Sequence, residues 1–427
     1  MKTIFAYLKE NTRYIINLGS TFLSQAISAA SILIMTPVLL HRLGTDDFAL
    51  YGIILNLVVF STVFDFGLNM GLLKRLIENP EKTERLISSI FFFFVGGTLF
   101  SSIFFFMFFS YKVVDVSNHN LLFAILTAIF VFQNMLALFF DILMQSVNKI
   151  FLGRIIRVIK LTVELFVLLG LTYFKSVIIL FLGSLVINCI YIYTLIYYSK
   201  REVQYRISLQ YFNWGLLIDH FKYSFWYFLN SIAIVLVFNT QVMLINRMAP
   251  AESVAKYLLV TRFYDVIRLG IANFIIVLFP TIAINQSNGN WIQIKQFFVK
   301  TLFRVSLLAL IIILFNFLLI KPFFLHWSKY NDAEINRLFL LFGVFIFLIL
   351  VDNVSATFLS ALKFNRSSTI VSIGQGILAL TLAYLLLPQY GIIGVVVGSI
   401  FALLVSNLIF NPVYLLLKIK MEHGGAL

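Results

Sequence analysis

The chain has 427 residues, of which 61% are hydrophobic and only 12% are charged, and its mean hydropathy is +0.98. A soluble globular protein carries about twice this charged fraction, so the composition excludes a soluble protein and predicts an all-α integral membrane protein. The single cysteine, Cys189, excludes a disulfide framework and any metal site built on paired thiolates.

Apolar runs of about 20 residues, the length of a transmembrane helix, recur along the whole chain. The first run follows Lys2, Lys9 and Arg13 and is much longer than the core of a cleavable signal peptide, so we expect it to be retained. Roughly twelve spans are predicted. They lie near 14–39, 48–73, 87–110, 121–147, 155–174, 176–198, 224–246, 255–283, 299–320, 337–361, 367–387 and 392–416.

The basic residues predict the orientation of these spans. If both termini are cytoplasmic, the inner segments hold about three times as many Lys and Arg residues as the outer segments, as the positive-inside rule requires. The formal net charge of +14 is then spread over many inner loops. This distribution argues against a single nucleic-acid-binding patch.

A connector between two halves is predicted at residues 199–223. The stretch "YRISLQYFNWGLLIDHFKYSFW" places apolar side chains three or four residues apart among polar ones, which is typical of a helix lying in the membrane interface. We therefore expect an N-terminal six-helix lobe at 1–198 and a C-terminal six-helix lobe at 224–427.

The two halves carry related sequences at the same point. "HRLGTDDFALYGI" follows the first predicted span and "NRMAPAESVAKYLL" follows the seventh; with one inserted residue, Arg42 aligns with Arg247 and Tyr51 with Tyr257. Two homologous lobes in the same orientation are the simplest account. Such repeats place a substrate site between the lobes, near the middle of the bilayer, so the pattern predicts a transporter with a central cavity.

Charged residues inside the predicted spans are the candidate functional residues. Each costs about 2.5–3.5 kcal/mol at the centre of a membrane helix, so we expect them to face protein or water. They are Asp65, Asp141, Glu164, Arg262, Asp265, Arg268 and Asp352.

In the second span, Ser61, Thr62, Asp65 and Asn69 would form a polar stripe on one continuous helix. Gly67 and Gly71 would let a second helix approach closely. Asp65 has two interpretations. It either accepts hydrogen bonds from a neighbouring helix, or it takes up a proton during a transport cycle.

The eighth span contains "TRFYDVIRLGIAN", which places Arg262, Asp265 and Arg268 at successive steps of three residues. One carboxylate cannot neutralise two guanidinium groups, and arginine suits bidentate binding of phosphate. Arg268 and Arg262 are therefore predicted to bind an anionic substrate. An alternative for Arg262 is that it extends to the outer interface.

Asp141 and Asp352 occupy equivalent places in the fourth and tenth spans, where either could serve in ion coupling or pair with an arginine of the eighth span. The five histidines show no metal-ligand spacing. The sequence also has no glycine-rich phosphate loop, so we predict neither a metal nor a cofactor.

The sequence resembles the polysaccharide-exporter branch of the multidrug, oligosaccharidyl-lipid and polysaccharide exporter superfamily. The stretches that carry the likeness are "RLGTDDFALYGI", "FDFGLNMGLLKRL", "LMQSVNKIFLGRII" and "LSALKFNRSSTIV". Within that branch the sequence is similar to O-antigen flippases. It departs from them at Gln241, near which relatives often carry an acidic residue.

The resemblance implies a flippase that moves polyprenyl-pyrophosphate-linked oligosaccharide across the bacterial inner membrane. Its implied partners are that lipid-linked substrate, membrane lipids, a polysaccharide polymerase and a chain-length regulator. A drug or cation exporter of the same superfamily is a second interpretation, which Arg268 disfavours. A membrane polymerase or glycosyltransferase is a third interpretation. Such enzymes need a large extramembrane loop, which this sequence does not contain, so we do not expect an enzyme.

Overall fold

The structure, a computed structural model, describes residues 12–78, 83–110, 120–146, 150–203, 205–276, 278, 282, 285–286 and 289–424. All regular elements in these ranges are helices, as the apolar composition predicts, because a backbone in lipid must satisfy its hydrogen bonds within the segment. The chain divides into two compact units, Met1–Ser231 and Ile232–Leu427.

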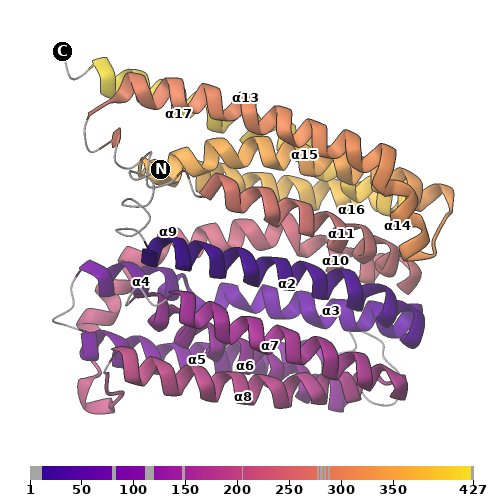
Figure 1. The fold of residues 1–427 in the computed structure, drawn as a ribbon, viewed down its shortest axis with the longest axis horizontal. Helices are drawn as coiled ribbons and strands as arrows, with labels where there is room; N and C mark the ends of the chain where they lie inside the picture. Colours follow the sequence, from indigo (N-terminus) through magenta and orange to yellow (C-terminus); the bar gives the residue numbers. More distant parts are fainter. Residues whose placement is uncertain are drawn as a thin grey trace. The chain divides into compact units, whose positions relative to one another are not determined.

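The helices of the first unit appear in indigo to magenta in Figure 1. They are α2 (Thr12–Leu43), α3 (Thr45–Ser61), a 3₁₀ turn (Thr62–Asp65), α4 (Leu68–Glu78), α5 (Thr83–Ser110), α6 (Asn120–Ser146), α7 (Ile150–Leu171), α8 (Val177–Val203) and the first part of α9 (Trp214–Phe238).

The second unit begins within α9 and continues from rose through orange to yellow. Its helices are α10 (Thr240–Met248), α11 (Ala251–Ile276), α13 (Trp291–Phe315), a π-helical segment (Asn316–Ile320), α14 (Lys321–Ser328), α15 (Ala333–Ala361), α16 (Asn365–Val405) and α17 (Asn407–Gly424).

Nine segments of the described chain are long and apolar enough to cross a membrane. The last of them, Arg366–Glu422, covers both the eleventh and the twelfth predicted spans. Within it, the backbone turns at Gly391, whose φ is +60°, and Gly398 then lies against Leu382 and Ala383. The predicted fifth and eighth spans correspond to α7 and α11, which fall outside the nine because each carries several charged residues.

The second predicted span is broken, where the hydropathy pattern predicts one continuous helix. The α-helix ends at Ser61 and a 3₁₀ turn ends at Asp65; Phe66 and Gly67 then take positive φ values of 52° and 70° before α4 begins. The stripe from Ser61 to Asn69 is therefore not one helical face. The expected close approach at Gly67 and Gly71 is present, because both glycines lie against Ser224 of α9.

The connector packs against the first unit. Ser88 on α5 accepts the backbone N–H of Ser208 at 3.3 Å and donates to the carbonyl of Arg206 at 3.1 Å. The hydroxyl of Ser89 accepts the N–H of Asn213 at 2.9 Å. These bonds hold the segment before α9 against the start of α5, so the connector and the first part of α9 belong to the first unit.

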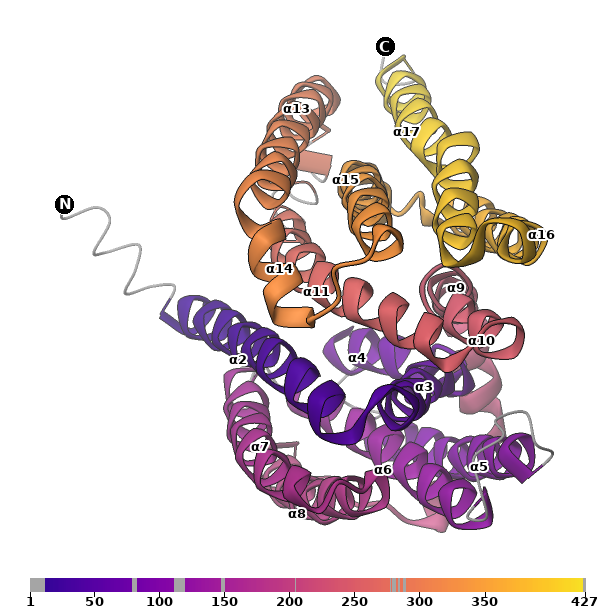
Figure 2. The same cartoon turned by 90° about the vertical axis from the view of Figure 1, so that its right-hand side faces the viewer.

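In the second unit, α15 lies among α11, α13, α16 and α17, as Figure 2 shows. A buried polar chain crosses this core: Asn316 donates to the Tyr264 hydroxyl at 2.8 Å, and that hydroxyl donates to the carbonyl of Phe339 at 2.8 Å. Asn316 also begins the π-helical segment. Its amide therefore has a buried partner at the point where the ordinary helical pattern changes.

Candidate functional site

The charged group of α11 is the strongest candidate for binding an anion. Arg268 forms an ion pair with Asp265, in which Nη2 lies 2.8 Å from Oδ1, and its Nε donates a hydrogen bond to the same oxygen at 2.9 Å. The guanidinium also lies over the ring of Phe238, 4.5 Å from its centroid. The Nε hydrogen bond uses one of the five N–H donors of the guanidinium, and 22% of the side chain is exposed.

Arg262 lies six residues earlier on the same helix and is partly exposed. Arg262 also interacts with another group in the protein. The helix thus carries two guanidinium groups and one carboxylate within this stretch, as the spacing in the sequence indicates.

Asp65 lies at the break between α3 and α4 and is 7% exposed. Its Oδ1 accepts the backbone N–H of Gly67 at 2.5 Å, so the carboxylate bonds to its own turn and not to a neighbouring helix. Asn69 is fully buried, and neither its amide nitrogen nor its oxygen has a hydrogen-bond partner in the described residues. The hydrogen bond of Asp65 thus lies within the break between α3 and α4.

Asp352 and Asp141 each accept a hydrogen bond from an uncharged amide side chain. Asp352 accepts a hydrogen bond from Asn411 at 2.8 Å, and Asn411 in turn accepts one from Ser368 at 2.8 Å, which joins α15, α17 and α16. Asp141 accepts a hydrogen bond from Gln145 at 3.1 Å, within α6. Among the described residues neither carboxylate forms an ion pair with an arginine of α11, so the expected pairing is not among their contacts.

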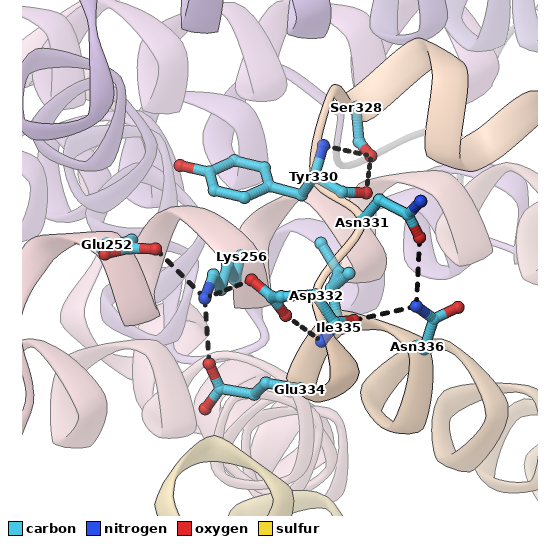
Figure 3. Close-up of polar contacts among 9 residues, drawn as sticks. All are labelled: Glu252, Lys256, Ser328, Tyr330, Asn331, Asp332, Glu334, Ile335 and Asn336. Carbon is cyan, nitrogen blue, oxygen red and sulfur yellow. Dashed lines mark hydrogen bonds and ion pairs between the residues drawn. The ribbon is translucent and has the colours of Figure 1, made fainter.

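A cluster of charges that the sequence analysis did not single out surrounds Lys256 (Figure 3). The ammonium lies 2.7 Å from Asp332, 3.1 Å from Glu252 and 3.1 Å from Glu334. Burial raises the pKa of Asp332, but Lys256 and the N–H of Ile335 outweigh it and hold that pKa below its usual value. The cluster ties the start of α11 to the start of α15. Only the Glu252–Lys256 spacing of four residues could have indicated it.

His220 is a second residue that sequence spacing did not reveal. It is fully buried where α9 meets α4, and its Nε2 lies 3.0 Å from the carbonyl of Leu68, so Nε2 carries the proton. Burial lowers the pKa of His220 to about 4; the Leu68 carbonyl opposes this change, and the charge of Arg75 adds to it. Arg75 is itself paired with Asp219 at 2.8 Å.

No group of His, Cys, Asp and Glu side chains within the described ranges is arranged to hold a metal ion. The polar side chains described above can bind anions, accept protons or join helices.

Solved structures share this fold. An inward-facing multidrug-resistance MATE transporter of the MOP superfamily is 13% identical, with a TM-score of 0.75, over 92% of this chain and 95% of its own. A MOP-superfamily transporter from Pyrococcus furiosus, described as having a binding pocket of reverse polarity, is 13% identical with a TM-score of 0.67 and 96% coverage of both chains. At these identities the likeness concerns the fold alone. No curated protein matches the sequence.

A family model described as "Polysaccharide biosynthesis protein" matches residues 15–286, which is more than half of the chain. The chain shares its fold with multidrug-resistance transporters, and nine described segments are long and apolar enough to cross a membrane. The family match and the fold agree with the resemblance seen in the sequence, and this chain belongs to the polysaccharide biosynthesis protein family of membrane exporters.

Proposed function

We propose that this protein is a flippase that moves a polyprenyl-pyrophosphate-linked oligosaccharide, an O-antigen or related repeat unit, from the cytoplasmic to the outer leaflet of a bacterial inner membrane. Both termini are then cytoplasmic, as the distribution of basic residues predicts. Transport proceeds by alternating access. A polysaccharide polymerase and a chain-length regulator are its expected downstream partners.

The proposal rests on the contacts and the partial exposure of the Arg268 guanidinium. A guanidinium in an apolar helix is costly, and a purely structural one would be expected to use its donors on protein groups. Arg268 donates the N–H of Nε to one carboxylate oxygen, with Nη2 in an ion pair with the same oxygen, and its side chain is partly exposed. Asp265 holds the group in place while the remaining donors suit a pyrophosphate oxygen.

A cation or drug exporter is the competing function, because the multidrug-resistance transporter shares the fold. A cavity for cations should present unpaired carboxylates. In the described residues, Asp265 is paired with Arg268, and Asp352 and Asp65 are engaged by Asn411 and Gly67. These contacts favour an anionic substrate.

Translocation of a fluorescent polyprenyl-pyrophosphate oligosaccharide in proteoliposomes tests the proposal. Arg268→Ala is expected to reduce the initial rate by about 10- to 100-fold, the range for losing charge-assisted hydrogen bonds of about 1.5–3 kcal/mol. The matched control is Arg304→Ala on α13, which removes the same charge from an exposed position. A folded wild type that moves a cationic dye but not the lipid-linked sugar would establish the exporter function instead.

A further inference from the structure

The break between α9 and α10 brings an aromatic ring against the charged group of α11. The last residue of α9 is Phe238. Two side chains that follow it bond back to carbonyl groups of the last turn of α9: the Thr240 hydroxyl donates to Val235 at 3.0 Å, and Nε2 of Gln241 donates to Val237 at 2.7 Å. Carbonyl groups at a helix end need such partners. The two bonds span Phe238, so its backbone is held at the break.

Asp265 and Phe238 contact different parts of the Arg268 guanidinium. Nε and Nη2 form one edge of this planar group, and both contact Oδ1 of Asp265. The ring of Phe238 lies against the guanidinium carbon, which is 4.5 Å from the ring centroid. The outer edge is formed by Nη1 and Nη2. Among the described residues, Nη1 has no hydrogen-bond or ion-pair partner.

These three side chains are neither enclosed in the protein nor fully exposed. The exposed fraction is 22% for the Arg268 side chain and 39% for that of Asp265, and Phe238 is also half-buried. An arginine side chain is long and flexible, so a free guanidinium loses much conformational entropy when it binds a ligand. Contacts that already restrict the guanidinium reduce this loss.

We propose that Phe238 is a positioning residue of the Arg268 site. The ring restricts the guanidinium while Asp265 occupies the Nε–Nη2 edge, so that the Nη1–Nη2 edge is presented to phosphate oxygens of the substrate. Phe238 acts through Arg268 and not on the substrate itself. The inference rests on the proposed function for the identity of the anion.

Packing alone is the competing explanation for Phe238, because a ring at the end of a helix also fills space. The two roles differ in how they depend on Arg268. A positioning role disappears when the guanidinium is removed, whereas a packing role remains. A double-mutant cycle between Phe238 and Arg268 therefore separates the two roles.

Binding of a radiolabelled polyprenyl diphosphate without sugars to the full-length protein measures this dependence. Phe238→Leu and Phe238→Met, which remove the ring, are each expected to raise the Kd about three- to tenfold. Phe238→Tyr keeps the ring and should stay within about twofold of the wild type. The matched control is Phe303→Leu on α13, which removes a ring that is 69% exposed and should also leave the Kd unchanged. In an Arg268→Ala background, Phe238→Leu is expected to change the Kd by less than about twofold.

Equal losses of affinity in the two backgrounds, or no loss in either, would overturn the positioning role if the variants melt like their parents. Translocation of the lipid-linked oligosaccharide separates that result from a failure of the proposed function. A wild type that shows the Arg268-dependent effect on diphosphate binding yet moves no lipid-linked sugar would refute the flippase function and retain the positioning role. A wild type that moves the sugar, with diphosphate binding that Phe238→Leu and Phe238→Met leave unchanged, would retain the flippase function and refute the positioning role.

Discussion

The packing of α4 against α9 depends on the protonation state of one residue, His220. The imidazole is fully buried, its Nε2–H donates to the carbonyl of Leu68, and its Nδ1 has no partner in the described residues. It lies four residues before the apolar segment that begins at Ser224. Protonation would place a second positive charge near Arg75, with only Asp219 to compensate. The neutral form is therefore the folded form.

We predict that the stability of the first unit falls between pH 6.5 and pH 4 through this residue. The folded-state pKa, about 4, lies below the unfolded value of about 6.5, so the unfolded state binds more protons in that window. The contribution of His220 to the free energy of unfolding is fully present above pH 6.5, and about 2 kcal/mol of it is lost by pH 5. His220→Gln keeps a donor for Leu68 without the titration. Thermal unfolding in detergent at pH 7.5 and pH 5 should show a smaller decrease for the variant, and equal decreases would contradict the assignment.

The break between α3 and α4 is the element in which the local backbone matters most. Gly67 has φ +70°, and an added Cβ would meet the backbone of Phe228 and the carbonyl of Ser224. Gly67→Ala is expected to destabilise the protein by about 2–4 kcal/mol, because it combines backbone strain with the separation of two packed helices. Gly96→Ala on α5 is the matched control: it has no atom within 4 Å and should be neutral or slightly stabilising. Equal melting temperatures for the two variants would show that the close approach is not required.

How far the sequence predicts each element depends on how local its cause is. The spacing of Arg268 and Asp265 predicts their contact, because it follows from helical geometry. Gly67 and Gly71 do lie close to α9, but Gly67 stands in the break before α4 and not on a helical face. The break at Phe66 is not predictable from hydropathy, since phenylalanine is neither a helix breaker nor polar. The partners of Lys256 are distant in sequence, with Glu334 78 residues away, so only tertiary packing brings them together.

At the scale of the whole molecule, the division between the units differs from the one that the connector predicts. The sequence places the boundary at 199–223, where the chain is amphipathic, whereas the first compact unit extends to Ser231. Ser88 donates a hydrogen bond to the connector and Ser89 accepts one from it, and His220 and Ser224 contact α4. An amphipathic pattern locates a segment relative to the membrane, but it does not show which neighbours that segment contacts.

The first unit should therefore require α9 for stable folding. We predict that a fragment of residues 1–248, which contains the whole of α9 and α10, melts at least about 5 °C above a fragment of residues 1–213, a difference of the order of 1–2 kcal/mol for a unit of this size. The shorter fragment exposes Leu68, Gly67 and Gly71, where α9 would pack. The Gly67→Ala substitution in the longer fragment is the internal control: it should remove most of the difference, because it disrupts the same contact. If the two fragments have the same melting temperature and resist protease equally, the boundary lies in the connector and α9 belongs with the second unit.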